Sequence, residues 1–235
     1  RAYDQLIHDV ALQKLDVTLA IDRAGFVGGD GATHAGIFDV SFLRCIPNMI
    51  IMSPSDENEC WKMLSTGYNY SGPAAIRYPR GEGPGTEILE NFDLLEIGKA
   101  RVINETLSDL VILSFGNMLD LSMEIADQIN CSLVDMRFIK PLDEELIEKC
   151  AKTYKHIISI EENVITGGAG SAVNEYLTKI GYSEKLKIFG IPDEFPIVGT
   201  QEDQRDAAGL TKDKILESLA SELDLKDLEE KVSAQ

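Results

Sequence analysis

The sequence predicts an α/β protein made of two α/β/α sandwich domains, each with a parallel or mostly parallel sheet. Short apolar segments that fit buried strands alternate along the chain with amphipathic segments that fit helices. Such alternation favours parallel sheets with helices on both faces. A run rich in glycine and proline, Gly81–Gly85, interrupts the alternation and divides it into two series. Of the 235 residues, 44% are hydrophobic, which is enough for packed cores in both parts.

The first series begins with a helix, because residues 1–14 place Tyr3, Ile7 and Val10 on one helical face. Residues 17–22, VTLAID, form a short apolar run that ends in a charge, which is typical of a buried parallel strand. The other short elements expected here are a helix at Phe38–Cys45 and strands at Met49–Met52 and Ala74–Tyr78.

A longer helix is expected between the last two of these strands. Ser55 is predicted to cap it, with Asp56 and Glu57 in the first turn, where carboxylates interact favourably with the helix dipole. The spacing of apolar residues predicts a buried face made of Cys60, Trp61, Leu64 and Tyr68.

The second series follows the glycine-rich run. Strands are expected at Ala100–Ile103, Leu110–Ser114, Ser132–Asp135, Ile157–Ile160 and Lys187–Phe189, and helices at Met118–Ile129, Glu144–Tyr154, Ser171–Ile180 and Lys212–Leu225. The predicted organisation is a first domain at 1–80, a linker at 81–97, a second domain at 98–225 and a tail at 226–235.

The formal net charge of −18 argues against nucleic acid as a partner, because phosphate backbones are bound by basic surfaces. The four cysteines form no C-x-x-C pair and no histidine stands at metal-ligand spacing from them, so we expect buried or inert thiols and no structural metal. No apolar run has the length of a membrane span, and no secretory signal is visible. The chain does not begin with Met, so we expect a fragment.

Two arginines follow strands of the first series. Arg23 comes after the strand at 17–22, and Arg80 comes after the strand at 74–78. The carboxyl ends of parallel strands lie at one edge of a sheet, where ligands gather. Two guanidinium groups at that edge would bind a phosphate or carboxylate. The alternative is that they pair with local carboxylates such as Asp22 or Glu82.

The loop between Arg23 and the next helix contains VGGDGATHAG, in which glycines surround Asp30 and His34. A carboxylate beside an imidazole fixes the tautomer of the ring, and such a histidine exchanges a hydrogen bond or a proton with a substrate oxygen. The alternative is an ordinary surface histidine in a flexible loop.

Two glycine motifs are interpreted as structural. Gly29-Asp30-Gly31 is similar to the start of a thiamine-diphosphate metal motif that ends in Asn, and Asn58 has about the right spacing. We reject that match because the motif lies several residues past the strand and Asn58 falls inside a predicted helix. Gly167–Gly170 follows two glutamates that would repel an anion, so a turn is favoured over a phosphate site.

Five segments resemble the 1-deoxy-D-xylulose-5-phosphate synthase family, and the resemblance extends from residue 1 to about residue 210. They are RAYDQLIHDVALQKL, AIDRAGFVGGDGATHAGIFDVSFLRCIPNMIIMSPSDENE, AIRYPRGEG, VDMRFIKPLDEELI and EENVITGGAGSAVNE. The resemblance implies the latter part of a pyrimidine-binding transketolase-like domain, followed by a transketolase C-terminal-like domain.

The resemblance also implies an activity. This family condenses pyruvate with glyceraldehyde 3-phosphate, with loss of carbon dioxide, using thiamine diphosphate and Mg2+, and its product supplies isoprenoid and thiamine synthesis. By resemblance Arg23 and Arg80 hold the phosphate of the acceptor, Asp30 and His34 contact the reacting carbon chain, and Arg1 matches a further active-site arginine. The cofactor-binding residues and metal ligands are expected outside this chain, in an N-terminal domain, and the assembly is expected to be a homodimer in the bacterial cytoplasm or the plastid stroma.

Two alternatives stay open from the sequence. One is a split transketolase or 2-oxoacid dehydrogenase β-type subunit that pairs with a separate chain. The other is a non-catalytic assembly module with the same fold.

Overall fold

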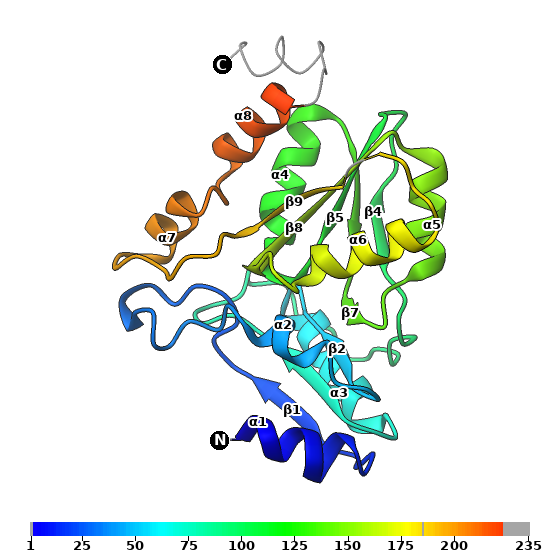
Figure 1. Ribbon diagram of the computed structural model, residues 1–235, viewed down its shortest axis with the longest axis vertical. Helices are drawn as coiled ribbons and strands as arrows, with labels where there is room; N and C mark the ends of the chain where they lie inside the picture. Colours follow the sequence, from blue (N-terminus) through cyan, green and yellow to red (C-terminus); the bar gives the residue numbers. More distant parts are fainter. Residues whose placement is uncertain (1, 185, 223–235) are drawn as a thin grey trace.

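A computed structural model describes residues 2–184 and 186–222, so Arg1 and the predicted tail at 226–235 lie outside the described residues. Figure 1 shows two sheets stacked along the long axis, the first near the N-terminus and the second above it. The strands are β1 (Thr18–Ile21), β2 (Ile50–Met52), β3 (Ala74–Arg77), β4 (Arg101–Asn104), β5 (Leu110–Ser114), β6 (Ser132–Asp135), β7 (Phe138–Lys140), β8 (His156–Val164) and β9 (Lys187–Ile191).

The helices cover these sheets. They are α1 (Ala2–Gln5), α2 (Asp39–Leu43), α3 (Glu57–Asn69), α4 (Leu119–Ile129), α5 (Glu144–Thr153), α6 (Ala169–Lys179), α7 (Gln201–Ala207) and α8 (Lys212–Glu222), with short 3-10 turns η2 (Gly28–Asp30) and η3 (Gly116–Met118). The predicted first helix is continued by a π-helical segment, η1 (Leu6–Ala11). No helix in the described part of the chain is both long and apolar enough to cross a bilayer.

Both sheets are mostly parallel, as predicted. The first has the order β1-β3-β2-β7 and the second the order β4-β6-β5-β8-β9. The antiparallel pairs are β2 with β7 and β4 with β6. Strand β7 was not expected from the sequence, and it carries a segment from the second half of the chain to the edge of the first sheet.

The central strand β5 shows why helices cover both faces of the second sheet. Its residues alternate, so Leu110 and Ile112 pack with α4 and α8, whereas Val111 and Leu113 pack with α5 and α6. The second of these cores continues down to Ile51 of β2 and to α2, so a single apolar region joins the two sheets.

Two expectations about α3 are wrong. The helix is capped by Asp56, whose Oδ1 accepts from the main-chain N–H of Glu59 at 2.7 Å. Ser55 is not the cap, because its hydroxyl donates to Asp135 instead. The buried residues of α3 are Glu59, Met63, Thr66 and Gly67, while Trp61 is 49% and Tyr68 82% exposed.

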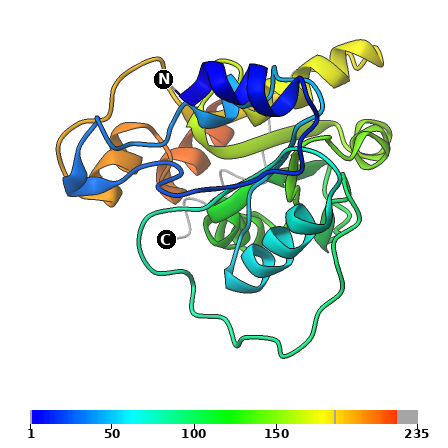
Figure 2. The ribbon, with the colours of Figure 1, turned by 90° about the horizontal axis from the view of Figure 1, so that it is seen from below.

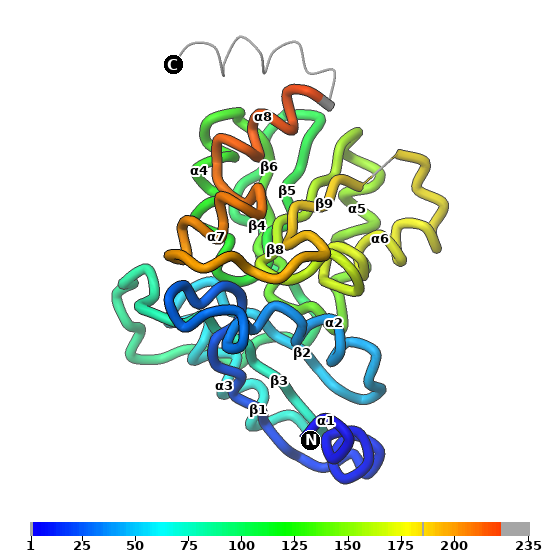
Figure 3. Tube along the Cα trace, turned by 60° about the vertical axis from the view of Figure 1, so that its left-hand side comes forward, coloured from blue at the N-terminus to red at the C-terminus, as the bar shows by residue number. Residues whose placement is uncertain are grey.

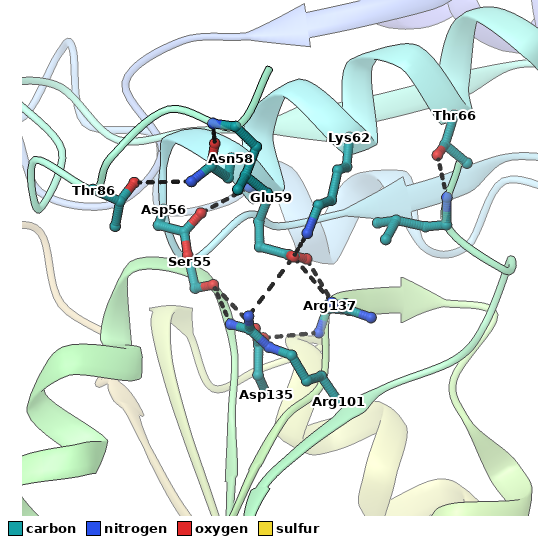
Figure 4. Close-up of polar contacts among 12 residues, drawn as sticks. Ser55, Asp56, Asn58, Glu59, Lys62, Thr66, Thr86, Arg101, Asp135 and Arg137 are labelled. Carbon is teal, nitrogen blue, oxygen red and sulfur yellow. Dashed lines mark hydrogen bonds and ion pairs between the residues drawn. The ribbon is translucent and has the colours of Figure 1, made fainter. Parts of the chain in front are cut away.

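The buried face of α3 includes the carboxylate of Glu59 because that part of the helix meets charged residues of the second half of the chain. Figure 4 shows this ion cluster, defined as Glu59, Lys62, Arg101, Asp135 and Arg137. Glu59 lies 2.7 Å from Nε of Arg137 and accepts from Lys62 at 3.0 Å, and Asp135 accepts from Arg101 at 3.0 Å. Burial favours the neutral form of Glu59, but the neighbouring cations outweigh it and keep its pKa below the usual value.

Residues 81–97 form no helix or strand but a long loop beside α3 (Figure 2). Glu57 accepts from the main-chain N–H of Gly85 at 2.8 Å, and Asn58 accepts from that of Leu89 at 3.0 Å. Polar side chains of α3 therefore hold this segment in place.

The cysteines are all free, but they are not all buried. Cys131 and Cys150 are buried, Cys60 is half-buried and Cys45 is exposed. Of the thiols expected to be buried or inert, Cys131 and Cys150 are buried, whereas Cys45 lies at the surface just after α2.

Candidate functional site

The candidate site lies at the edge formed by the carboxyl ends of β1, β2 and β3. These three strands are parallel neighbours, so the segments that follow them leave the sheet on the same side. The structure therefore places Arg23, in the loop after β1, on the same edge as Arg80, which follows β3. Of the predicted site residues, Arg1 lies outside the described part of the chain.

The two arginines converge on one oxygen atom. Nε of Arg80 donates to Oδ2 of Asp30 at 2.6 Å, and Nε of Arg23 lies 3.7 Å from the same atom. Arg23 also donates from Nη1 to Asp22 at 2.7 Å. The arginine side chains are 44% and 47% exposed, so both remain open to a ligand from solution. Arg23 is thus paired with Asp22, as in the alternative of local pairing, whereas the partner of Arg80 is the distant Asp30 and not Glu82.

His34 is oriented differently from the expectation. Its Nδ1 lies 3.1 Å from the main-chain carbonyl oxygen of Asp30 and 3.1 Å from Oγ1 of Thr33, while the Asp30 carboxylate faces the arginines. A carbonyl oxygen only accepts, so its hydrogen bond to the ring requires the hydrogen on Nδ1. In the neutral ring Nε2 is then left as an acceptor.

The glycine-rich loop is closed at its base. The main-chain N–H of Gly36 donates to the carbonyl of Arg23 at 3.0 Å, and that of Gly25 donates to the carbonyl of Gly36 at 2.8 Å. A side chain at Gly36 would place its Cβ 2.2 Å from the carbonyl oxygen of Arg23, so only glycine permits this approach.

A buried arginine that the sequence analysis did not single out supports the loop. Arg77, in β3, is 3% exposed and donates to both carboxylate oxygens of Asp39, at 2.7 and 3.2 Å. It also donates to the main-chain carbonyls of Gly36 and Glu162, both at 3.2 Å. One side chain thus connects the end of the loop, α2 and β8.

A second buried group joins the loop to the other half of the chain. The Glu162 side chain is fully buried and accepts from Nε of Arg205 at 2.6 Å and from Asn117 at 2.5 Å. Its carboxylate lies directly beside Gly25. These residues are distant in the chain, and no local sequence pattern connects them.

A cavity of about 410 Å³ opens beside Arg80. It lies between the two halves of the chain, since Tyr78 and Glu57 line one side and Asn117, Gln201 and Arg205 line the other. Arg80 and Arg205 both contribute to its wall, so a small anionic molecule that reaches the cavity would meet two guanidinium groups.

The surroundings of the two glycine motifs are as follows. Asn58 lies inside α3, away from Gly29-Asp30-Gly31, and donates to the carbonyl of Glu87 at 2.9 Å. At the start of α6, Glu161 accepts from the main-chain N–H groups of Ala169 and Gly170 at 2.7 and 2.8 Å. An internal carboxylate therefore occupies this helix N-terminus, and burial raises the pKa of Glu161 to about 7.

Profiles of two domains match nearly the whole chain. The transketolase pyrimidine-binding domain matches residues 1–86, and the transketolase C-terminal domain matches residues 98–215. Together with the two mostly parallel sheets, these matches show that the chain belongs to the transketolase family.

Within this family the chain is similar to 1-deoxy-D-xylulose-5-phosphate synthases. It is 54% identical over 217 residues to the enzyme of Psychromonas ingrahamii, covering 90% of this chain and 35% of that protein. It is 53% identical over 219 residues to the enzyme of Pseudoalteromonas translucida, covering 93% of this chain and 35% of that protein. The chain thus spans about 35% of the length of these relatives.

Two solved structures share the fold. A split-gene transketolase, described as an inactive beta4 tetramer, superimposes with a TM-score of 0.84 at 28% identity, covering 96% of this chain and 73% of that one. The transketolase of Campylobacter jejuni superimposes with a TM-score of 0.71 at 22% identity, covering 91% of this chain and 32% of that one.

Proposed function

We propose that this chain is part of a synthase that condenses pyruvate with glyceraldehyde 3-phosphate, with decarboxylation, to give 1-deoxy-D-xylulose 5-phosphate. The observation that carries the proposal is the convergence of Arg23 and Arg80 on one oxygen atom at the edge of the first sheet. The similarity to relatives that bear this enzyme name supports it. The product would supply isoprenoid and thiamine synthesis.

In this proposal the Asp30 carboxylate oxygen occupies the place of a phosphate oxygen. It already accepts from Arg80 at 2.6 Å, and a phosphate group offers more oxygens and more charge to the same two guanidinium groups. The phosphate would displace Asp30 and fix the far end of the acceptor. This remote contact would orient the aldehyde end for reaction.

His34 would act on the reacting end of the acceptor. With the hydrogen on Nδ1, its Nε2 accepts a hydrogen bond from a substrate hydroxyl, and the protonated ring donates one to an oxyanion. The contact of Nδ1 with the main-chain carbonyl of Asp30 would hold the ring in place.

Within the described residues, no group of three or more His, Cys, Asp or Glu side chains is placed to hold a metal ion. Near the candidate site, Asp30 is already engaged with Arg80. We therefore propose that Mg2+ and the diphosphate are bound by an N-terminal domain outside this chain, and that the chain alone is inactive. A homodimer in the bacterial cytoplasm or plastid stroma completes this proposal.

The arginine pair is tested in the full-length synthase by replacing Arg80 with Ala. The expected result is a rise in KM for glyceraldehyde 3-phosphate of about tenfold or more, from the loss of a charge-assisted hydrogen bond, with little change in KM for pyruvate. Glu82→Ala is the control, because Glu82 lines the same cavity without an assigned role. Unchanged kinetics in Arg80→Ala would remove Arg80 from the phosphate site.

His34 is tested separately with the His34→Gln variant. We expect a large loss of kcat while thiamine diphosphate binding is retained. A collapse of cofactor affinity with kcat preserved at saturating cofactor would show that His34 serves the cofactor and not the acceptor.

A second candidate function is a subunit of a split transketolase that pairs with a separate chain. The similarity to a split-gene transketolase, of which this chain covers 73%, favours it. The open reading frame discriminates between the two. An in-frame upstream segment with a GDG…N metal motif supports the synthase, a separate adjacent gene supports the split enzyme, and neither would favour a non-catalytic assembly module.

A further inference from the structure

Helix α7 lies against the glycine-rich loop of the candidate site, although it comes from the far end of the chain. Figure 3 shows α7 and the segment before it directly beside this loop. The sequence analysis predicted no helix here. Thr200 caps the helix, with its hydroxyl oxygen accepting from the main-chain N–H of Asp203 and the Asp203 carboxylate accepting from that of Thr200.

Two glutamines of α7 bind main-chain atoms of the site. Nε2 of Gln201 donates to the carbonyl of Phe26 at 2.6 Å and, over a longer 3.4 Å, to the carbonyl of Arg80. Gln204 accepts from the main-chain N–H of Gly28 at 2.9 Å and donates to its carbonyl at 3.4 Å. The helix therefore binds both the loop after β1 and the segment after β3.

Helix α7 and the glycine-rich loop are closely packed. Gln204 is 1% exposed and Phe26 is 1% exposed. A Cβ at Gly28 would lie 3.1 Å from the main-chain nitrogen of Gln201, so the loop and the helix already touch. Arg205, next in the helix, is fixed by its ion pair with Glu162 at 2.6 Å.

We propose that Gln201 is a positioning residue that sets the separation of the Arg23 loop and the Arg80 segment, and thereby the geometry of the acceptor-phosphate site. This inference rests on the proposed function. A primary amide has two N–H groups, and Gln201 directs them at carbonyl oxygens of two different segments. A residue without that pair of donors cannot bridge the segments in this way.

The test uses the full-length synthase and three variants. Gln201→Met keeps the length of the side chain and removes both N–H donors. Arg80→Ala removes the guanidinium group that is proposed to bind the phosphate. Glu202→Met is the matched control, because Glu202 is the exposed neighbour on the same helix. Each variant is assayed with glyceraldehyde 3-phosphate and with glyceraldehyde, which lacks the phosphate.

We expect Gln201→Met to raise KM for glyceraldehyde 3-phosphate about tenfold, the scale of a lost hydrogen bond plus a small misplacement of the arginine. Its kcat/KM for glyceraldehyde should stay at the wild-type value. For Glu202→Met, both KM for glyceraldehyde 3-phosphate and kcat/KM for glyceraldehyde should stay at the wild-type values. A merely structural role would lower kcat/KM equally for the two acceptors.

Other outcomes overturn the inference in distinguishable ways. If Arg80→Ala loses the phosphate preference but Gln201→Met keeps it, α7 has no positioning role and the proposed function stands. If Arg80→Ala also keeps it, the proposed phosphate site fails and this inference fails with it. Should Gln201→Met not fold, Gln201→Glu provides the same comparison, since a carboxylate suits this first-turn position but cannot donate to the two carbonyls.

Discussion

Three glycines of one loop offer a graded test of how tightly the loop is held. Gly25 and Gly31 have nearly the same positive φ, +81° and +80°, but different surroundings. A Cβ at Gly25 would lie 2.2 Å from Oε2 of Glu162, whereas one at Gly31 would meet nothing within 4 Å. Gly29 has neither a positive φ nor a close neighbour. Alanine therefore adds neither cost at Gly29, only backbone strain at Gly31, and both backbone strain and a steric clash at Gly25.

The magnitudes follow from the structure. Alanine in the left-handed region costs about 1–2 kcal/mol, which is the full expectation for Gly31→Ala. In Gly25→Ala the side chain of Glu162 must also move, and Asn117 and Arg205 hold that carboxylate at 2.5 and 2.6 Å. Losing even one such charge-assisted hydrogen bond costs about 1.5–3 kcal/mol, so the total is about 2.5–5 kcal/mol. Gly29→Ala should lie within about 0.5 kcal/mol of wild type.

Urea unfolding followed by circular dichroism measures these differences, provided that the m-value is unchanged. The expected order of stability is wild type and Gly29→Ala, then Gly31→Ala, then Gly25→Ala. If Gly25→Ala were as stable as Gly31→Ala, the side chain of the buried Glu162 would move without loss of stability, and Glu162 would not anchor the loop.

Three further predictions concern stability and reactivity. Glu59→Met should lower the free energy of unfolding by about 3–5 kcal/mol, because it removes a buried carboxylate and leaves the half-buried Arg137 without its partner, and urea unfolding measures the loss. Glu161 has a folded pKa of about 7, well above the unfolded value, so its ionisation removes stability as the pH rises from about 4.5 to 7, by about 3 kcal/mol. Glu161→Gln should lose less stability than wild type over that range, as unfolding at pH 5 and pH 8 would show. Cys45, which is exposed, should react with a thiol reagent in the native protein, whereas the buried Cys131, whose pKa is raised to about 12, should react only after unfolding.

Each of these three predictions has a result that would contradict it. A Glu59→Met variant as stable as wild type would mean that the ion cluster contributes no net stability. Parallel pH curves for wild type and Glu161→Gln would show that Glu161 ionises as readily in the folded chain as in the unfolded one. Equal labelling of Cys45 and Cys131 would contradict the described burial.

The sequence was sufficient for features that arise locally. The run at 110–114 is apolar except for Ser114, and it forms a strand, β5, that is buried along its whole length, as that pattern predicts. The run at 17–22 also forms a strand, β1, but the expectation of full burial is wrong there, because Ala20 is exposed and the other residues of β1 are half-buried. The placement of Arg23 and Arg80 at one edge also followed from the predicted strands, because parallel neighbours carry the segments after them to the same edge of the sheet. The role of both arginines in binding phosphate stays a prediction.

Elements that form only through contacts with distant parts of the chain could not be predicted from the local sequence. Strand β7 has three residues, and it is a strand only because β2 offers an unpaired edge. The buried face of α3 carries Glu59, which a search for apolar spacing passes over, and that burial is tolerable because Arg137 and Lys62 pair with its carboxylate. Helix α7 is short and polar, and its hydrogen bonds to the loop carry no signal in its own sequence.

The sequence by itself determined the layered α/β architecture and the edge at which the charged side chains meet, since both follow from local hydrophobic pattern and strand direction. Only the tertiary structure decided that the Asp30 carboxylate faces the arginines while its carbonyl oxygen faces His34. It also decided that α7 holds the loop. The physical reason is that these contacts pair single polar atoms from segments up to 176 residues apart, and nothing in the neighbourhood of either atom along the chain specifies its partner.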